Sequence, residues 1–351
     1  MKPTPHSALR LILWVLAVLL VTAAAFGLRF RAAGLLPIDY DEDDYLLAGQ
    51  HYAAALTSGD LAEFTRYDYN YEHPPLAKMA YGAVLAFLPR VEEIPQRPVS
   101  APPAASLPQP HLQAARLTSA VFGTLQVLLL AVLNPLAGLF LAVHTFTIKY
   151  TSQVMLEALP ALTGLIAILA YARSRRQLNA WLLLSALALG LTAAGKYLYA
   201  AAGIAILLHW LVELGEGESP AARRRSIGLF LVWGFLSLLF FFAANPYLWP
   251  DPPGRLLQSL TYNLNYSTGE QVQSAALPFW QPLAYLTSSV PWHPGVFLVS
   301  IDGLIAVLGM VGFGRLWREK RIYALWLLVG LAFLLVWPTK WPQYILLVTA
   351  P

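Results

Sequence analysis

The chain has 351 residues, of which 58% are hydrophobic and 12% charged, and it carries a formal net charge of +4. A mean hydropathy of +0.56 excludes an ordinary soluble domain and favours a polytopic membrane protein. Most Lys and Arg residues lie in short loops, which indicates cytoplasmic loops rather than a nucleic-acid partner. The absence of cysteine excludes disulfides, thiolate catalysis and thiolate metal sites, and it carries no information on the compartment.

The first apolar stretch, LILWVLAVLLVTAAAFGL, follows Lys2 and Arg10 and contains three alanines at 23–25. A charged start, an apolar core and small residues are also the parts of a secretory signal with a cleavage site. The stretch is long enough to cross a bilayer, however, and many further apolar stretches follow it. We therefore interpret it as an uncleaved first span.

The remaining apolar stretches predict a series of membrane crossings. Together with the first, they are expected near residues 8–30, 113–132, 135–150, 155–172, 178–195, 197–213, 227–243, 296–314, 322–337 and from 343 onward. The last crossing begins just before Pro351, so we expect that the chain stops within a span and that its C-terminus is truncated. The stretch at 75–89 is too short to cross and is expected to be interfacial or buried.

Basic clusters orient these crossings, because Lys and Arg concentrate on the cytoplasmic side of a membrane. With a cytoplasmic N-terminus, the clusters at 173–176, 223–225 and 315–321 all fall on that side. The segments 31–112 and 244–295 then face outward as two long loops. The basic residues that count against this orientation are Arg29, Arg31 and Lys149. No internal repeat is visible, which weakens the alternative of an inverted-repeat transporter.

The first outer loop opens with an acidic run, PIDYDEDDYL at 37–46. The residues that follow predict an amphipathic helix over 42–57, with Asp41 as its N-cap and acids in its first turn, at the positive end of the helix dipole. Taken alone, such a run favours a helix start in water. Capping and solvation are the roles expected for the flanking acids Asp39, Asp43 and Asp44.

A second distinctive stretch, YNYEHPPLAKM at 69–79, follows in the same loop. Pro75 fits the first turn of a helix, and His73 before two prolines is expected to be extended. Lys78 fits a lysine that extends its ammonium group toward water from the membrane interface. An Asp-Glu pair followed by His-Pro-Pro-Leu-x-Lys is nevertheless a specific combination, and it favours a functional site over two unrelated structural features.

These two motifs, Asp41-Glu42 and HPPLAK at 73–78, resemble those of the bacterial family 39 glycosyltransferases, the group of protein O-mannosyltransferases and aminoarabinose transferases with the GT-C architecture. Weaker matches follow in the family's order over most of the chain: ARLTSAVFGTL at 115–125, SQVMLEALPAL at 152–162, LGLTAAGKYLY at 189–199, NPYLWPDPPGRL at 245–256 and TKWPQYILL at 339–347. The sequence departs from the family in the acids that flank the pair and in Glu157, where relatives often have Asp. The distal soluble domain of some relatives does not follow in this sequence.

The resemblance implies an all-α polytopic membrane protein of GT-C architecture, with about ten transmembrane helices in one domain over 1–351 and amphipathic helices in the first outer loop. It implies an inverting glycosyltransferase of the cell membrane with its active site on the outer face. The enzyme would move a sugar from a polyprenyl-phosphate carrier to a hydroxyl of a protein, lipid or glycan acceptor. That hydroxyl needs a base, for which Asp41 is the candidate, with Glu42 positioning a substrate. One carboxylate suffices because phosphate is a good leaving group, whereas a glycoside hydrolase needs two.

The departing lipid phosphate is negatively charged and needs cations or hydrogen-bond donors. The candidates for this phosphate-binding role are His73, Lys78, Arg116 and Lys196. Arg116 at a span entry also fits an interfacial anchor, and Lys196 fits the boundary between two spans, although ionisable residues at membrane depth are often functional. Supporting or acceptor-binding residues are expected to be Glu157, Tyr247, Lys340 and Tyr344. A belt at the membrane surface is the alternative for most of the Tyr and Trp residues.

No metal or other cofactor is expected to be required. The spacing of Asp39, Asp41 and Asp43 resembles the opening of a calcium-binding loop, but the Gly of such a loop is absent and Gln50 or His51 stands near the place of its bidentate Glu. A divalent cation held by the clustered acids is an alternative that is not favoured. The competing function is a transporter or channel with an acidic outer vestibule, which leaves HPPLAK unexplained, and a membrane scaffold explains neither motif. The sequence does not name the sugar or the acceptor.

Overall fold

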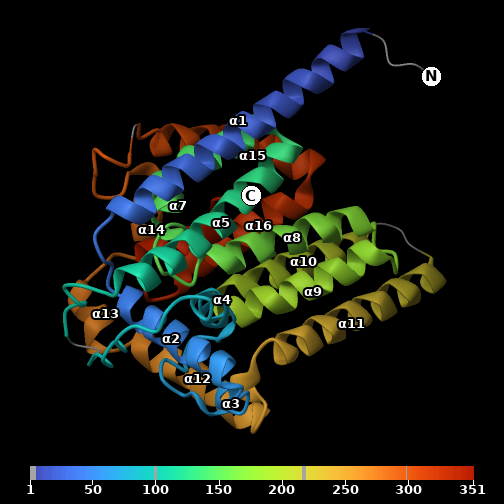
Figure 1. Cartoon of the computed structure of the whole chain (residues 1–351). Helices are drawn as coiled ribbons and strands as arrows, with labels where there is room; N and C mark the ends of the chain where they lie inside the picture. Colours follow the sequence, from blue (N-terminus) through green and yellow to red (C-terminus); the bar gives the residue numbers. More distant parts are fainter. Residues whose placement is uncertain (1–4, 99–100, 216–218, 298) are drawn as a thin grey trace.

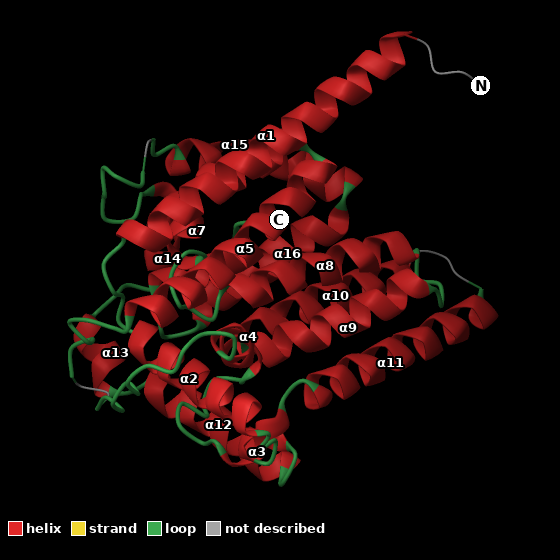
Figure 2. Ribbon diagram, in the orientation of Figure 1, coloured by secondary structure: helices red, strands yellow, loops and turns green. Residues whose placement is uncertain are grey.

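The computed structural model describes residues 5–98, 101–215, 219–297 and 299–351, and this part of the chain is helical with no β-strand (Figures 1 and 2). The all-α fold that the sequence predicts is thereby confirmed. In chain order the helices are α1 (Pro5–Leu35), α2 (Glu42–Ser58), α3 (Glu63–Arg66), α4 (Leu76–Leu85), α5 (Gln109–Leu133), α6 (Pro135–Val143), α7 (Thr145–Tyr150), α8 (Ala158–Ser174), α9 (Ala180–Gly195), the 3-10 helix η1 (Tyr197–Ala200), α10 (Ala201–Gly215), α11 (Pro220–Ala243), the 3-10 helix η2 (Pro246–Leu248), α12 (Pro252–Ser267), α13 (Glu270–Ala275), α14 (Gln281–Thr287), α15 (Asp302–Glu319), α16 (Arg321–Val336) and the 3-10 helix η3 (Pro342–Val348).

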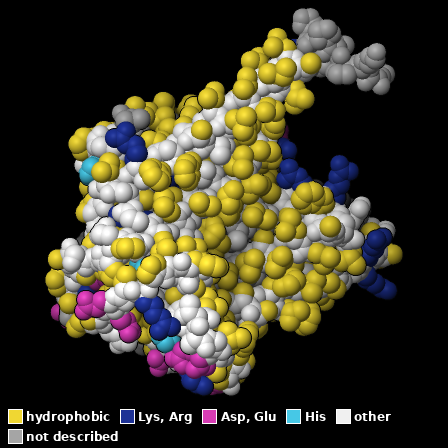
Figure 3. Space-filling view, in the orientation of Figure 1, with side chains coloured by type: hydrophobic (Ala, Val, Ile, Leu, Met, Phe, Trp, Pro, Cys, Tyr) yellow, Lys and Arg dark blue, Asp and Glu magenta, His cyan; other side chains and the backbone are white. Residues whose placement is uncertain are grey.

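Four helices of the described chain are long and apolar enough to cross a bilayer: Ala8–Leu35 in α1, α5, the continuous η1–α10 segment and α11. The shorter apolar helices α8, α9 and α16 lie among them in one bundle (Figure 1). Hydrophobic side chains cover the sides of this bundle, whereas Asp and Glu gather at one end (Figure 3). Leucines such as Leu20 and Leu231 are 70% and 63% exposed, as expected for side chains that face lipid. The chain is a membrane protein.

The predicted crossing at 135–150 is wrong as a single helix, because the chain breaks at His144. This residue is extended, with φ −62° and ψ 118°, and it separates the short helices α6 and α7. Its Nδ1 atom accepts a hydrogen bond from the Thr147 N–H at 3.3 Å and so caps the start of α7. The break turns the chain, and α6 packs against α1 and α5. Neither piece is long enough to cross a bilayer alone.

The helices that carry the two sequence motifs are α2 and α4, and they pack closely on each other. Gly82 of α4 makes this possible, since a Cβ atom there would lie 2.6 Å from the Tyr52 Cβ and 3.0 Å from the Gly49 carbonyl oxygen. Helix α2 matches the helix predicted over 42–57, and Gly59 ends it in the left-handed region at φ 75°. Helix α4 has ten residues, as expected of a stretch too short to cross.

The 244–295 segment lies against α3 and the loop that follows it. From α12, Ser259 Oγ donates to the Tyr71 carbonyl at 2.9 Å, and Asn263 Nδ2 donates to the Glu72 carbonyl at 2.9 Å. Arg255 Nη1 donates to the Thr65 carbonyl at 2.6 Å. The two long segments therefore form one structural unit, and α2, α3, α12 and α13 gather at the same end of the molecule (Figure 1).

Candidate active site

The candidate site begins at the turn that leads into α2. Asp41 occupies the N-cap position of this helix, as the sequence predicts, but its side chain makes no capping hydrogen bond. The turn is closed instead by Asp39 and Glu42. The Asp39 N–H donates to Glu42 Oε2 at 2.9 Å, and the Glu42 N–H donates to the Asp39 carbonyl oxygen at 3.2 Å. The helix start therefore leaves the Asp41 carboxylate available for chemistry.

Glu42 is fully buried and accepts hydrogen bonds from protein groups through both carboxylate oxygens. Arg116 donates to it twice, from Nε to Oε1 at 2.8 Å and from Nη2 to Oε2 at 2.5 Å. The Val154 N–H donates to Oε1 at 2.7 Å. Arg116 also donates to the backbone carbonyls of Ala33, Leu36 and Pro37. The guanidinium thus ties the acidic turn to the end of α1, and its N–H groups bind protein partners rather than standing free for the donor phosphate that the sequence suggests.

The acids that flank the Asp41-Glu42 pair, Asp39, Asp43 and Asp44, also have cationic partners. Arg97 donates from Nε to Asp43 Oδ2 at 2.9 Å and from Nη2 to Asp44 Oδ2 at 2.8 Å. Asp39 pairs with Lys149 at 2.9 Å. This ion pair gives a structural reason for Lys149, which the predicted orientation places on the outer side against the usual charge pattern. Asp43 is only 2% exposed, so the solvating role predicted for it is wrong. A carboxylate is buried at tolerable cost only when it is paired, and this one is.

Asp41 differs from its neighbours, because within the described chain it forms no ion pair. Its hydrogen-bond partner is Tyr45, whose Oη donates to Oδ2 at 3.4 Å. The side chain is partly exposed. Desolvation by the surrounding protein raises the pKa of this carboxyl to about 7, an effect that Lys196 opposes and Glu157 reinforces. A carboxylate with a pKa near neutrality is matched to accept a proton at physiological pH.

Lys196 and Glu157 form a buried ion pair close enough to act on the charge of Asp41. Glu157 immediately precedes α8, where a negative charge is favourable at the positive end of the helix dipole. Lys196 follows α9, and its Nζ lies 5.1 Å from the centroid of the Tyr344 ring in η3. The sequence predicts these three as site residues, and three separate helices bring them together with Asp41.

His73 contacts Tyr45, the residue that donates to Asp41. The two ring centroids lie 5.9 Å apart in an edge-to-face arrangement. Burial holds the pKa of His73 well below its usual range, and the charges of Lys196 and Lys78 lower it further. The imidazole is therefore neutral at physiological pH. It can donate one hydrogen bond to a phosphate, but it does not bring the positive charge of an imidazolium.

Lys78 is almost fully buried in α4, and its ammonium group holds the loop before it. Nζ donates to the Asn70 carbonyl at 2.7 Å, to the His73 carbonyl at 2.9 Å and to Asn70 Oδ1 at 3.4 Å. Burial lowers the pKa of Lys78 to about 8, and the charge of Glu72 opposes this shift. All three donors of the ammonium are used, so in this structure Lys78 fixes the position of His73 rather than facing open space.

Two further predicted residues make other contacts. Tyr247 stacks on Tyr71 with ring centroids 6.0 Å apart, and its Oη donates to Gln258 at 3.1 Å. These contacts belong to the packing of α12 and η2 on the first long segment. Lys340 closes the end of α16 by donating to the backbone carbonyls of Leu334, Leu335 and Trp337. Such lysines satisfy the last carbonyls of a helix, which have no partner within it.

Three residues around Asp41 are absent from the predicted set: Tyr45, Tyr266 and Arg97. Burial raises the pKa of the Tyr266 phenol, and the charge of Asp41 adds to this rise, so Tyr266 of α12 lies near the Asp41 carboxylate. Trp341 Nε1 donates to the Tyr266 Oη at 3.3 Å. A sequence signal exists only for Arg97, the single charged residue of the Pro-rich stretch 95–110.

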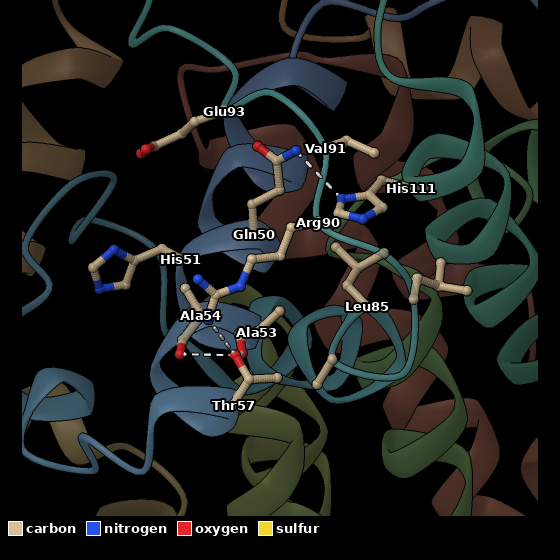
Figure 4. Close-up of a pocket in the computed structure, with 12 residues that line it drawn as sticks. Gln50, His51, Ala53, Ala54, Thr57, Leu85, Arg90, Val91, Glu93 and His111 are labelled. Carbon is tan, nitrogen blue, oxygen red and sulfur yellow. Dashed lines mark hydrogen bonds between the residues drawn. The ribbon is translucent and has the colours of Figure 1, made fainter.

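Two cavities lie at the same end of the molecule. One, of about 250 Å³, lies along the C-terminal half of α2, and among its lining residues Gln50 Nε2 lies 3.3 Å from His111 Nδ1 (Figure 4). The other, of about 470 Å³, reaches Arg116 beside the Pro-rich segment. Neither is lined by Asp41 or Lys196. Among the described residues, no group of three or more His, Cys, Asp or Glu side chains is arranged to hold a metal ion.

The fold is similar to two solved membrane-protein structures. ArnT from Cupriavidus metallidurans bound to undecaprenyl phosphate is 15% identical, with a TM-score of 0.58 over 97% of this chain and 58% of that chain. The S. cerevisiae protein O-mannosyltransferase Pmt1-Pmt2 complex bound to the sugar donor is 18% identical, with a TM-score of 0.51 over 66% of this chain and 33% of that chain. The chain thus spans little more than half of the first structure's length and a third of the second's. No protein-family model and no curated protein matches it. The likeness shows the GT-C fold that the sequence motifs imply.

Proposed function

We propose that this chain is an inverting glycosyltransferase that moves a sugar from a polyprenyl-phosphate carrier to an acceptor hydroxyl, with Asp41 as the general base. One observation carries the proposal: Asp41 lacks a cationic partner in a run whose other acids are all paired. A carboxylate that is left unpaired at such a position costs stability, and residues of this kind are typical of active sites. Its pKa of about 7 suits proton transfer at neutral pH.

In the proposed reaction, the acceptor oxygen bonds to the anomeric carbon while the bond from that carbon to the phosphate oxygen breaks. Asp41 takes the hydroxyl proton, and the electron pair of the broken bond leaves with the lipid phosphate. A single displacement of this kind inverts the anomeric centre, and the proposal involves no cofactor. Lys196 and the neutral His73 imidazole stabilise the charge on the departing phosphate. Glu157 holds Lys196 in place through their ion pair.

The proposed substrates and location follow the fold neighbours and the charge pattern. ArnT binds undecaprenyl phosphate, and the Pmt1-Pmt2 complex binds its sugar donor, which supports a polyprenyl-linked donor for this chain. The basic clusters at 173–176, 223–225 and 315–321 support a cytoplasmic N-terminus and a site on the outer face of the cell membrane. A protein, lipid or glycan acceptor fits the proposed reaction, because each can offer a hydroxyl.

The test compares wild type with Asp41→Asn in lipid, using a panel of polyprenyl-phosphate sugars and measuring release of polyprenyl phosphate. Loss of a general base lowers turnover by about 10²–10⁴-fold. Asp60→Asn is the matched control, since Asp60 is an exposed carboxylate in the same segment, and it is expected to retain wild-type turnover. Wild-type turnover in Asp41→Asn would show that Asp41 is not the general base. Absence of turnover with every donor, together with cation flux into liposomes, would favour the transporter alternative.

A further inference from the structure

We propose that Arg97 is a positioning residue for Asp41: it holds the Pro-rich segment against the acidic turn and neutralises Asp43 and Asp44, the two carboxylates that follow Glu42. This inference rests on the proposed function, because it concerns the base of the proposed reaction. Neither sequence motif contains Arg97, which lies in the Pro-rich stretch 95–110. Arg97 nevertheless makes more contacts with the acidic turn than any other residue of that stretch for which contacts are described.

The contacts of Arg97 surround the turn on both sides of Asp41. Its Nε and Nη2 bind Asp43 and Asp44, as described above, and Nη2 also donates to the Tyr40 carbonyl at 2.8 Å. The guanidinium carbon lies 4.3 Å from the centroid of the Tyr40 ring, which adds a cation–π contact. Arg97 therefore holds the residue before Asp41 and the two acids after Glu42. The planar fork of arginine can bridge these acceptors at once, whereas a lysine ammonium cannot match the same geometry.

The segment that carries Arg97 is itself held in place. On the N-terminal side, the Ile94 N–H donates to Gln50 Oε1 at 3.0 Å in α2. On the C-terminal side, the Ala104 N–H donates to Asp43 Oδ2 at 3.0 Å. Arg97 Nη1 donates to the Ala101 carbonyl at 2.8 Å and so folds the segment on itself. Several prolines restrict the backbone further, which lowers the entropy lost when the segment is ordered. The described residues on both sides of Arg97 are thus hydrogen-bonded to α2.

Charge neutralisation gives this contact a consequence for the proposed base. Asp44 is among the acids whose charge raises the pKa of Asp41, and Arg97 forms an ion pair with Asp44. Asp39 of the same turn and, from other elements, Lys196 and Glu157 also act on Asp41. The phenols that interact with its charge are those of Tyr45, Tyr150, Tyr266 and Tyr344. Removal of the Arg97 charge would leave Asp43 and Asp44 uncompensated. The pKa of Asp41 would then rise, and less of the base would be ionised at neutral pH.

The experiment measures the pH dependence of turnover for wild type, Arg97→Gln, Arg97→Lys and the double variant Arg97→Gln with Asp44→Asn. In Arg97→Gln, the acidic limb of the profile is expected to move up by roughly one pH unit, with lower turnover at neutral pH. In Arg97→Lys, the charge remains and the limb stays close to wild type, while turnover falls because the fork is lost. The double variant removes the uncompensated Asp44 charge and brings the limb back toward wild type.

Arg90→Gln is the matched control, because Arg90 precedes the same Pro-rich stretch, is exposed and donates a single hydrogen bond to Thr57. Its profile and turnover are expected to equal those of wild type. Thermal unfolding of each variant in detergent identifies those that fail to fold. If Arg97→Gln is folded and keeps both its acidic limb and its turnover, the proposal is overturned. An Arg97→Gln protein whose melting temperature falls while its acidic limb and its turnover equal those of wild type would also overturn the proposal.

A second readout does not depend on enzymatic turnover. A hydrophobic carbodiimide reacts with protonated carboxyl groups, so the labelling of Asp41 against pH, followed by peptide mass spectrometry, reports the protonation of this residue directly. The labelling midpoint is expected to rise in Arg97→Gln and to return in the double variant. If wild type transfers no sugar from any donor, the proposed function fails, and the labelling midpoints still decide whether Arg97 controls Asp41. An unchanged midpoint in Arg97→Gln would overturn the inference by itself.

Discussion

Arg116 binds Glu42 through two parallel hydrogen bonds of 2.8 and 2.5 Å, in a buried pair that anchors the acidic turn to the end of α1. The two carboxylates of the Asp41-Glu42 pair therefore differ in burial and in hydrogen bonding. Glu42 is enclosed and fully bonded, while its neighbour has a single weak contact with Tyr45. In this structure Glu42 holds the turn through its hydrogen bonds, and Asp41 is the carboxylate of the pair without an ionic partner.

Removal of either partner of this pair is expected to destabilise the protein. Arg116→Met leaves Glu42 buried without a cation, which costs roughly 3–5 kcal/mol of unfolding free energy. The double variant Arg116→Met with Glu42→Gln removes both charges, so its loss should be clearly smaller than the sum of the two single losses. Thermal unfolding of the three variants in detergent measures this. Arg31→Met, an exposed arginine on α1, serves as control. Additive losses would contradict the coupling of the pair.

Asp41→Asn is expected to stabilise the protein at neutral pH while it removes activity. The pKa of Asp41 is about 7 in the folded protein against an ordinary value of 3.8, so between these pH values the folded state binds more protons than the unfolded state. Wild-type stability therefore falls as pH rises through this window, and Asn has no such dependence. The melting temperature of Asp41→Asn should exceed that of wild type by a few degrees at pH 8 and equal it near pH 4. A constant difference at both pH values would argue against a raised pKa.

Lys196 and Glu157 should shift the pH profile of turnover in opposite directions. Lys196 lowers the pKa of Asp41 and Glu157 raises it. In Lys196→Met the acidic limb is expected to move to higher pH, with turnover reduced about 10²-fold because the departing phosphate loses a cation. In Glu157→Gln the limb is expected to move to lower pH. Initial rates at saturating donor between pH 5 and pH 9 measure both. Shifts in the same direction would indicate that the variants act through misfolding.

Much of the architecture is predictable from the sequence because hydropathy determines it locally. The helix over 42–57 and the short helix after Pro75 follow from acids in a first turn, from a proline and from an apolar run too short to cross. The break at His144 is not predictable in the same way. The predicted crossing at 135–150 has sixteen residues and is interrupted by His144 and Lys149, but the place of the break depends on a cap and on packing against α1 that composition does not reveal.

The candidate site is predictable only in part, because a charged residue requires a partner and the sequence does not identify that partner. The sequence predicts Arg116 as a phosphate ligand, and it does not reveal that Arg116 binds the carboxylate of Glu42, 74 positions away. Arg97 lies 53 positions from Asp44 within a stretch of low complexity. Long-range pairs of this kind depend on how α2, α5 and the Pro-rich segment pack. The expectation that Lys196, Glu157, Tyr344 and Asp41 serve one site stays a prediction, although the structure gathers them.

The loop that carries His73 should depend on Lys78 for its position. Lys78→Met would leave the carbonyls of Asn70 and His73 without their buried donor, which costs about 1–3 kcal/mol of unfolding free energy for such a group. Because His73 then loses its fixed place near Tyr45, we expect the KM for the donor to rise and turnover at saturating donor to fall. Lys320→Met, at an exposed lysine between α15 and α16, is the control and should leave both parameters unchanged. Initial rates against donor concentration, measured beside thermal unfolding in detergent, separate the two effects. A Lys78→Met protein that loses stability but keeps the wild-type KM and turnover would show that His73 needs no support from this lysine.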